Sequence, residues 1–320
     1  MAVYTEIDDE DLRRFVAEYD IGAVTGLKGI AEGVENTNYL LQTDRGTYIL
    51  TIYEKRVDPK DLPFFLGLLD HLSNRGVPCP PTIHGRDGKA LRRVAGKPAA
   101  VQTYLPGIWP KRPGAAHCGE VGAALARMHL AGRDYPHARH NALSIDGWAE
   151  LVEATAGRAD DVAVGLGDEI AREFEYLSGH WPIGLPTGVI HADLFPDNVF
   201  FMDDKLTGLI DFYFACTDAL AYDLAICLNA WCFERSGEFN ITKARRLLSA
   251  YRAVRPVNEA ELAALPLLAR GSALRFLLTR LYDWLNQVDG AMVKPKDPLE
   301  FLHKMRFHGR VGGPGAYGLD

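Results

Sequence analysis

The sequence has no excess of basic residues. Its 35 lysines and arginines are outnumbered by 42 aspartates and glutamates, and the formal net charge at pH 7 is −7. Proteins that bind a nucleic-acid backbone or an anionic membrane surface use clustered positive charge. The composition therefore gives no electrostatic case for either partner, and we expect a small molecule as the ligand.

The sequence also lacks long apolar runs and has few cysteines. No run of about 18 consecutive apolar residues is present to span a bilayer, and the acidic, amphipathic N-terminus has no apolar signal-peptide core. The five cysteines include no C-x-x-C pair of the kind that binds zinc or undergoes redox cycling. We expect a cytoplasmic protein, without membrane or nucleic-acid partners, whose cysteines are reduced and mostly buried.

What the sequence does contain is enough apolar material for two lobes. The chain has 320 residues, of which 48% are hydrophobic, and this length suits two lobes better than one small domain. Glycine-punctuated β segments run from residue 24 to 53, and helical periodicity dominates from about residue 115 to about residue 308. We predict an N-terminal lobe over residues 1–104 and a C-terminal lobe over residues 105–320, with an extended glycine-rich tail from residue 309.

Polar residues interrupt two apolar runs in the stretch VIHADLFPDNVFF, residues 189–201. Asp193 and Asn198 are separated by four residues, and Asp211 follows after a DDK turn that would fold a second strand back onto the first. The three oxygen-bearing side chains are then predicted to converge at one end of a hairpin. This arrangement suits phosphoryl transfer, in which one carboxylate orients the attacking hydroxyl while an Asn and a second carboxylate hold magnesium against the nucleotide phosphates.

Each polar residue of this stretch also has a structural interpretation. His191 is more typical of an anchor for the loop than of a chemical participant, and Asp197 could be only a turn former. A purely structural role for Asp193, Asn198 and Asp211 together is disfavoured, because three buried oxygen ligands without a cation are costly. We therefore predict an active site, with Asp193 and His191 as the candidate catalytic residues.

The pattern H-x-D-x-x-x-x-N followed by D-F resembles the aminoglycoside phosphotransferases and choline-kinase-like small-molecule kinases. Within that group, HADLFPDNVFF and DFYFACTDALAYDLAICLNAWCFE are most similar to the homoserine kinases of bacterial threonine biosynthesis. The resemblance covers both lobes. It implies an α+β, two-lobed protein-kinase-like fold, with a smaller β-rich N-terminal lobe and a larger helical C-terminal lobe.

The same resemblance implies an activity and its cofactors. The reaction would be ATP-dependent phosphorylation of the side-chain hydroxyl of L-homoserine, with ATP and Mg²⁺ as cofactors. Asp193 would be the catalytic base, and Asn198 and Asp211 would be the magnesium ligands. Choline, methylthioribose, an aminoglycoside or another amino alcohol stays open as the acceptor, and we expect a monomer or a homodimer.

The N-terminal lobe offers candidates for ATP contacts. In GIAEGVENTNYLL, Gly29 and Gly33 would let the backbone approach phosphates, although a simple β-turn would use the same glycines. By resemblance, the backbone of the strand VQTYLPG would meet adenine. The candidate ATP-binding residues are Gly29, Gly33, Asn36, Gln102, Tyr104 and Leu105.

One residue typical of related kinases is missing. The segment YILTIYEKR has Thr51 where related kinases carry the strand-three Lys that contacts the α- and β-phosphates. Lys55, Arg56 or a residue elsewhere replaces that charge, or the phosphates are held mainly by backbone groups and metal. The nearest candidate for the usual partner Glu is Asp61. The missing Lys also permits a second hypothesis, a nucleotide-binding module without catalysis.

An amino-acid acceptor needs protein groups of both charges. Along residues 217–233, one face carries Asp218, Tyr222 and Asn229 and no Lys, Arg or Glu, which favours a cleft over solvent. In residues 272–287, Arg275 flanks a leucine stripe and could clamp a carboxylate, although such an Arg is often structural. The candidate acceptor residues are Asn38, Asp218, Tyr222, Asn229 and Arg275, while Asp223, by resemblance, braces the catalytic loop.

Overall fold

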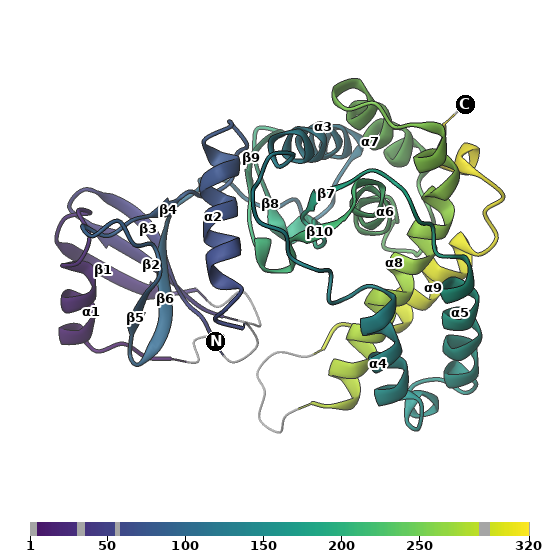
Figure 1. Cartoon of the computed structure of the whole chain (residues 1–320), viewed down its shortest axis with the longest axis horizontal. Helices are drawn as coiled ribbons and strands as arrows, with labels where there is room; N and C mark the ends of the chain where they lie inside the picture. The colour runs from purple at the N-terminus through teal and green to yellow at the C-terminus, as the bar shows by residue number, and fades with distance from the viewer. Residues whose placement is uncertain (1–4, 31–35, 55–57, 288–294, 320) are drawn as a thin grey trace. The chain divides into compact units, whose positions relative to one another are not determined.

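The computed structural model describes residues 5–30, 36–54, 58–287 and 295–319. The chain divides into two compact units, whose elements are labelled in Figure 1. Unit 1 comprises Met1–Gly107 and Thr207–Tyr213, and unit 2 comprises Ile108–Leu206 and Phe214–Asp320. The segment Thr207–Tyr213, which we expected in the C-terminal lobe, thus belongs to unit 1. The functional division of the chain at residue 104 stays a prediction.

Unit 1 is built on a six-stranded antiparallel sheet with the order β1-β2-β3-β6-β4, in which β5 also pairs with β6. The strands are β1 (Val24–Gly29), β2 (Thr37–Thr43), β3 (Gly46–Ile52), β4 (Thr82–Ile83), β5 (Arg92–Val94) and β6 (Lys97–Thr103). The β5–β6 hairpin turns at Ala95 and Gly96, whose φ angles of +48° and +74° match the two-residue turn that follows strand twist.

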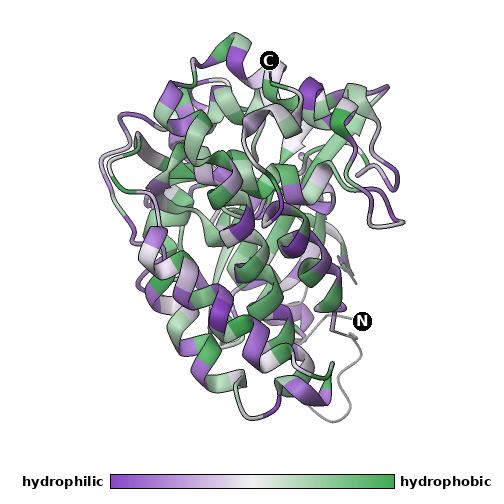
Figure 2. Cartoon of the chain, turned by 90° about the vertical axis from the view of Figure 1, so that its right-hand side faces the viewer, coloured by the Kyte–Doolittle hydropathy of each residue, from purple (hydrophilic) through white to green (hydrophobic). Residues whose placement is uncertain are grey.

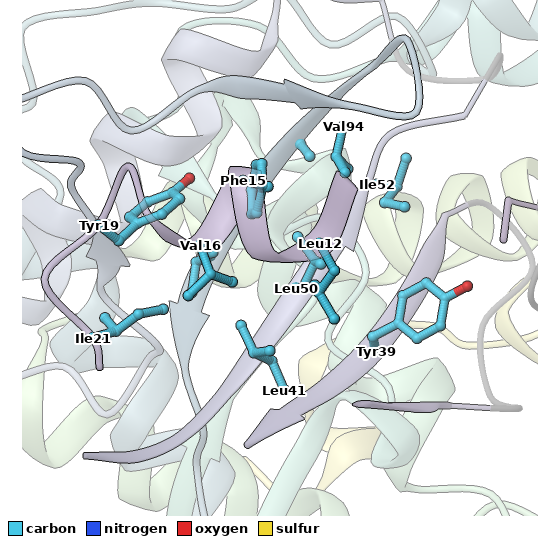
Figure 3. Packing of buried hydrophobic residues seen from close by; sticks show 12 residues of the cluster. Leu12, Phe15, Val16, Tyr19, Ile21, Tyr39, Leu41, Leu50, Ile52 and Val94 are labelled. Atoms are coloured by element: carbon cyan, nitrogen blue, oxygen red, sulfur yellow. The ribbon is translucent and has the colours of Figure 1, made fainter. Parts of the chain in front are cut away.

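The hydrophobic core of unit 1 lies between one face of this sheet and helix α1 (Asp9–Val16). Helix α1 begins where the Asp8 side chain accepts a hydrogen bond from the backbone of Asp11. Its apolar stripe packs against alternate residues of β2 and β3, as Figure 3 shows. The core includes Leu12, Phe15, Val16, Tyr39, Leu41, Leu50 and Ile52. Helix α2 (Leu62–Ser73) also belongs to unit 1. Because strand residues alternate between faces, the positions between these core residues face the other side of the sheet.

Unit 2 is mainly helical, as the periodicity predicted. Its helices are α3 (Ala115–Ala131), α4 (Ile145–Thr155), α5 (Leu166–His180), α6 (Leu220–Trp231), α7 (Ile241–Val254), α8 (Glu259–Leu285) and α9 (Leu299–His308). The strand β7 (Thr187–Ile190) pairs with β10 (Cys216–Ala219). Figure 2 shows hydrophilic and hydrophobic residues interleaved along the helices, which is the pattern of helices that bury one face.

The hairpin predicted after the catalytic motif is confirmed. The strands β8 (Val199–Met202) and β9 (Lys205–Leu209) form a two-stranded sheet. Both turn residues, Asp203 and Asp204, have positive φ angles of +47° and +60°. Aspartate tolerates this conformation better than most residues, which explains why a turn without glycine forms here.

Helix α8 has the length and apolar composition of a membrane span, but 61% of its most apolar window is buried inside the structure. That burial is the behaviour of a core helix in a globular protein. Helix α8 packs against α4, α5, α6 and α9, so its apolar residues are buried against other helices.

The prediction of an extended C-terminal tail is wrong. Residues Pro314–Tyr317 form a turn of 3₁₀-helix, and the Tyr317 side chain is fully buried. Its hydroxyl pairs with Nδ1 of His308 at 2.8 Å. Burial of one large aromatic side chain outweighs the conformational entropy of the surrounding glycines, and glycine composition alone did not reveal that anchor.

Candidate active site

The loop that carries Asp193 lies in unit 2, between β7 and β8. A short 3₁₀-helix, Pro196–Asn198, ends the loop just before β8. The side-chain amide of Asn198 donates to the backbone carbonyl of Asp193 at 2.8 Å and to its carboxylate Oδ2 at 3.2 Å. These bonds hold the carboxylate in one orientation, which a base that must align a hydroxyl requires.

His191 is buried in the same loop. Its imidazole Nδ1 accepts a hydrogen bond from the backbone N–H of Asp193 at 3.3 Å. This contact agrees with the interpretation of His191 as a loop anchor. A chemical role for His191 stays a prediction.

Asp223 of α6 braces this loop. Its Oδ2 accepts from the backbone N–H of His191 at 2.7 Å, and its Oδ1 accepts from the N–H of Ala192 at 2.9 Å. Burial by itself would raise the pKa of the Asp223 carboxyl, but the hydrogen bonds from the His129 side chain and from the backbone N–H of His191 lower the pKa below its ordinary value. The brace is therefore a buried carboxylate in its charged form, as the resemblance implied.

Arg275 of α8 holds the other side of the loop. Its Nη1 donates to the backbone carbonyl of Ala192, and its guanidinium lies over the Phe276 ring, 4.5 Å from the centroid. The side chain is only 2% exposed. The structure therefore places the candidate carboxylate clamp directly behind the residue that precedes Asp193, and its role in acceptor binding stays a prediction.

Two further acceptor candidates belong to the same part of unit 2. Tyr222 is buried, and burial raises the pKa of its phenol. The charge of Arg275 lowers this pKa, and the charge of Asp218 raises it. Asp218 is partly exposed, and its Oδ2 accepts from the Asn141 side-chain amide at 2.7 Å. The structure thus brings Asp218, Tyr222 and Arg275 within electrostatic reach of one another.

Asn229 differs from these candidates. Its amide donates to the backbone carbonyl of Ala269 at 2.8 Å, and its oxygen pairs with Nε2 of His308 at 3.1 Å. It is fully buried. These contacts give Asn229 a structural role between helices, and its assignment to the acceptor stays a prediction.

The second face of the unit 1 sheet carries a polar group around Thr51. The Thr51 hydroxyl donates to Oδ1 of Asn38 at 2.8 Å, directly across the β2–β3 pair. Tyr213 contributes hydrogen bonds with Thr51 and Gln102, and its hydroxyl pairs with that of Tyr53 at 3.4 Å. Where related kinases have a lysine, this sheet therefore has neutral, mutually bonded side chains.

Asp211 lies beside this polar group. Burial raises the pKa of Tyr213 to about 12; its hydrogen bond with Tyr53 lowers the pKa, and the charge of Asp211 raises it. Asp211 itself has a φ of +65°, a left-handed conformation that most non-glycine residues avoid. Sequence analysis missed Tyr53 and Tyr213, although Tyr213 directly follows the D-F pair of the motif.

The remaining ATP candidates also belong to unit 1. Gly29 ends β1, Tyr104 and Leu105 follow β6, and Asn36 accepts from the backbone N–H of Glu54 at 3.4 Å. Tyr104 is exposed, whereas Asn36 and Gln102 are buried. Gly33, Lys55 and Arg56 lie outside the described residues.

The donor set for magnesium is small. Within the described ranges, no three or more His, Cys, Asp or Glu side chains gather into a possible metal site. The two expected ligands, Asn198 and Asp211, offer amide and carboxylate oxygens. Mg²⁺ prefers hard oxygen ligands and commonly takes only one or two from the protein, the rest from phosphates and water, so these residues fit the ion.

Comparisons with known proteins agree with this chemistry. The chain matches the model of the phosphotransferase enzyme family over residues 26–257. It is 64% identical over 320 residues to the homoserine kinase of Rhodospirillum rubrum, covering 100% of both chains. It is 61% identical over 326 residues to the homoserine kinase of Paramagnetospirillum magneticum, again covering 100% of both.

Solved structures show the same fold at low identity. An amicoumacin kinase in complex with AMP-PNP, Ca²⁺ and its ligand matches with a TM-score of 0.71 at 16% identity, covering 96% of this chain and 95% of that one. A microcompartment-associated aminopropanol kinase matches with a TM-score of 0.71 at 18% identity, covering 98% and 99%. These likenesses confirm the predicted α+β, protein-kinase-like fold.

Proposed function

The chain belongs to the phosphotransferase enzyme family, and from that premise we propose that it is a homoserine kinase. It transfers the γ-phosphoryl group of ATP to the side-chain hydroxyl of L-homoserine and releases O-phospho-L-homoserine and ADP. The observation that carries this proposal is the likeness to homoserine kinases over the full length of both chains, at 64% identity with the Rhodospirillum rubrum enzyme.

Asp193 is the base of this reaction. As the homoserine oxygen attacks the γ-phosphorus, the hydroxyl proton passes to the Asp193 carboxylate and the bond from the phosphorus to the ADP oxygen breaks. The amide of Asn198 keeps the carboxylate oriented, since it donates to Oδ2 at 3.2 Å. His191 supports the same orientation from the backbone of Asp193.

Mg²⁺, when it is bound with ATP, neutralises charge on the phosphates. The oxygen of Asn198 and the carboxylate of Asp211 would hold it. ATP itself would contact Gly29, Gly33, Asn36, Gln102, Tyr104 and Leu105. With Thr51 bonded to Asn38, the protein offers neutral groups at the position of the strand-three Lys.

Acceptor specificity follows from groups of both signs. Asp218, which is partly exposed, receives the ammonium of homoserine, and Arg275 with Tyr222 receives its carboxylate. Asn38 and Asn229 complete the set of acceptor residues. A substrate without one of the two charges leaves a protein group desolvated and unpaired, which costs about 1–3 kcal/mol.

The reaction takes place in the cytoplasm. All five cysteines are free and buried, which suits a reducing compartment. The net charge of −7 supports the absence of nucleic-acid and membrane partners, and a monomer or a homodimer would carry out the chemistry.

An assay of ADP release with purified protein and magnesium-ATP tests the proposal. The acceptors are L-homoserine, L-serine, L-threonine, homoserine methyl ester, 4-hydroxybutyrate and choline. We expect the highest kcat/KM with L-homoserine and the lowest with choline. If choline or the methyl ester matched homoserine, the assignment of homoserine would be wrong. ATP binding without turnover of any acceptor would instead favour a nucleotide-binding module.

A further inference from the structure

A buried chain of hydrogen bonds leads away from the catalytic loop into the helices of unit 2. It begins at Asp223, whose Oδ2 lies 3.1 Å from Nε2 of His129 on α3. Nδ1 of His129 lies 2.7 Å from the Tyr251 hydroxyl on α7. Arg255 donates to that hydroxyl at 3.1 Å and to Glu261 at 2.8 Å. Four buried side chains beyond Asp223 therefore line up behind the loop.

Both ends of this chain are fixed by backbone groups. At one end, Asp223 accepts the N–H groups of His191 and Ala192. At the other end, Glu261 is part of the capping box of α8: its Oε2 accepts from the backbone N–H of Asn258 at 3.0 Å. The chain thus connects the catalytic loop to the first turn of the longest helix, without an exposed residue in between.

The packing of α3 on α7 holds the middle of this hydrogen-bond chain, where His129 meets Tyr251. Gly122 of α3 lies so close to α7 that a Cβ atom added there would come within 2.1 Å of the Leu247 carbonyl oxygen. Two helices at this separation place the His129 and Tyr251 rings 5.7 Å apart between centroids. The imidazole therefore has little room to change its orientation.

The hydrogen bonds from Arg255 to Asp223 all donate in the same direction, toward the catalytic loop. The Arg255 guanidinium can only donate, so the Tyr251 oxygen accepts from it. Among the described residues, the other hydrogen-bond partner of this hydroxyl is Nδ1 of His129. A proton on Nδ1 would leave the buried Tyr251 O–H without an acceptor, so the O–H donates to Nδ1. The proton of the ring then lies on Nε2 and is donated to Asp223. The hydrogen bonds select a neutral His129 with the proton on Nε2.

The loop needs such a support, because its backbone is strained. Ala192 has a φ of +62°, a left-handed conformation that costs an L-amino acid with a Cβ about 1–2 kcal/mol. In this conformation, two successive N–H groups reach one carboxylate, and the next residue is Asp193. The rotamer of Asp223 therefore controls the backbone that presents the base.

We propose that His129 is a positioning residue for the catalytic base: as the neutral Nε2–H tautomer selected by Tyr251, it fixes Asp223, and through Asp223 the strained turn before Asp193. The proposal relies on the proposed kinase activity only for the kinetic part of its test. His129 touches neither substrate nor cofactor in this account, and its effect passes through Asp223.

Two substitutions at His129 separate this role from simple packing. In His129→Gln, an amide N–H can take the place of Nε2–H and donate to Asp223. In His129→Asn, the oxygen can take the place of Nδ1 and accept from Tyr251, but the donor to Asp223 is lost. We expect kcat to fall less than about fivefold in His129→Gln and about 10–100-fold in His129→Asn, with the KM for ATP nearly unchanged in both. Equal losses of kcat in the two variants would overturn the proposal.

A second substitution tests the link to backbone strain and guards against a folding defect. Ala192→Gly removes the cost of the left-handed conformation, so it should restore at least part of the kcat lost in His129→Asn. The kcat of the double variant is compared with that of the single variant Ala192→Gly, so that the effect of the glycine alone is divided out. If Ala192→Gly restored thermal stability to His129→Asn without restoring kcat, His129 would be a packing residue and the proposal would be wrong.

The protonation state gives a test that does not depend on activity. In ¹⁵N-histidine-labelled protein, His129→Gln identifies the His129 signals, and the ring should show a protonated Nε2 and an unprotonated Nδ1 at pH 7. Tyr251→Phe, which removes one oxygen and keeps the ring, takes away the donor to Nδ1, so it should shift the Nδ1 resonance while Nε2 stays protonated against the Asp223 carboxylate. A doubly protonated ring, or a proton on Nδ1, in the wild type would overturn the proposal. Because this measurement needs no substrate, it stays decisive even if the chain does not phosphorylate homoserine.

Discussion

The two regions that carry the predicted site residues are built from different kinds of interaction. In unit 2, the loop of Asp193 is held by ionised, buried groups: Asp223 on its amides and Arg275 on the Ala192 carbonyl. In unit 1, the face with Thr51 is held by neutral groups, Asn38 and Tyr213. Charge-assisted bonds are shorter and stronger than neutral ones. Of these two regions, the charge-assisted contacts hold the loop of the proposed base, Asp193.

This comparison also explains how the chain can lack the strand-three Lys. A buried lysine beside Asn38 would need a charged partner, because an isolated ammonium in an apolar sheet is expensive to desolvate. Thr51 avoids that cost. In the proposed reaction, Mg²⁺ and backbone groups, or a basic residue elsewhere in the site, would meet the phosphate charge. We therefore expect the neutral sheet face with Thr51 to affect nucleotide affinity. The loop of Asp193, which is held by charged groups, should determine turnover.

The largest effect is expected at the base. Asp193→Asn should lower kcat by roughly 10³-fold, because general base catalysis contributes about 10²–10⁴-fold and an amide cannot accept the proton. Its fold and its affinity for magnesium-ATP should stay nearly unchanged. Turnover, calorimetric ATP binding and melting temperature measure the three properties. A kcat close to that of the wild type would remove Asp193 from its role.

The metal ligands test the two regions against each other. Asp211→Ala in unit 1 should raise the magnesium concentration required for half-maximal activity by at least about tenfold, since it removes a charged ligand. Asn198→Ala in unit 2 should raise it less, but should also lower kcat because the amide orients Asp193. Magnesium titrations of both variants decide this. An unchanged metal requirement in both would contradict the assignment.

Substitution of Arg275 tests two contacts, the observed one to the Ala192 carbonyl and the proposed one to the acceptor carboxylate. Arg275→Ala should lower kcat/KM for L-homoserine by about 10²-fold or less, as one buried charge-assisted contact is lost. If Arg275 binds the acceptor carboxylate, the variant also loses its preference for homoserine over the methyl ester. A preserved preference would leave Arg275 as a support for the Ala192 carbonyl alone. Arg275→Lys is the matched control, because it keeps the charge but not the planar fork.

The neutral face should respond more weakly. Thr51→Val removes one hydroxyl at nearly constant volume and leaves Asn38 without its partner. We expect the KM for ATP to rise about two- to tenfold and stability to fall by about 1 kcal/mol, with kcat almost unchanged. A loss of kcat comparable to that of Asp193→Asn would break the distinction between the two regions.

The smallest effect is a difference in acid sensitivity. The pKa of Asp223 is lower in the folded protein than its ordinary value of 3.8, so its contribution to stability is present above pH 3.8 and is lost as the pH falls through the folded pKa. Tyr213, with a pKa of about 12, stays neutral throughout this range. The melting temperature of the wild type should therefore approach that of Asp223→Asn below pH 3.8, whereas its difference from Tyr213→Phe should not change.

The sequence by itself determined the local features of this protein. The H-x-D-x-x-x-x-N spacing, the turn at Asp203 and Asp204, and the apolar stripe of α8 depend on residues near one another in the chain, and periodicity and turn chemistry record such relations directly. The same local rules predicted a hairpin after the motif and a helical second part. It was the resemblance to related kinases that showed Thr51 standing where a lysine is usual.

Only the tertiary structure decided which distant groups meet. His129, Tyr251 and Glu261 have no shared motif, and a lone histidine on an apolar helix face gives no sign of its partner. Their contacts join residues 94 and 122 positions apart, and they exist because Gly122 lets α3 approach α7. The buried Tyr317 in a glycine-rich tail was missed for the same reason. Burial is a property of the whole packed chain, since the free energy of a polar or aromatic side chain depends on neighbours that only folding supplies.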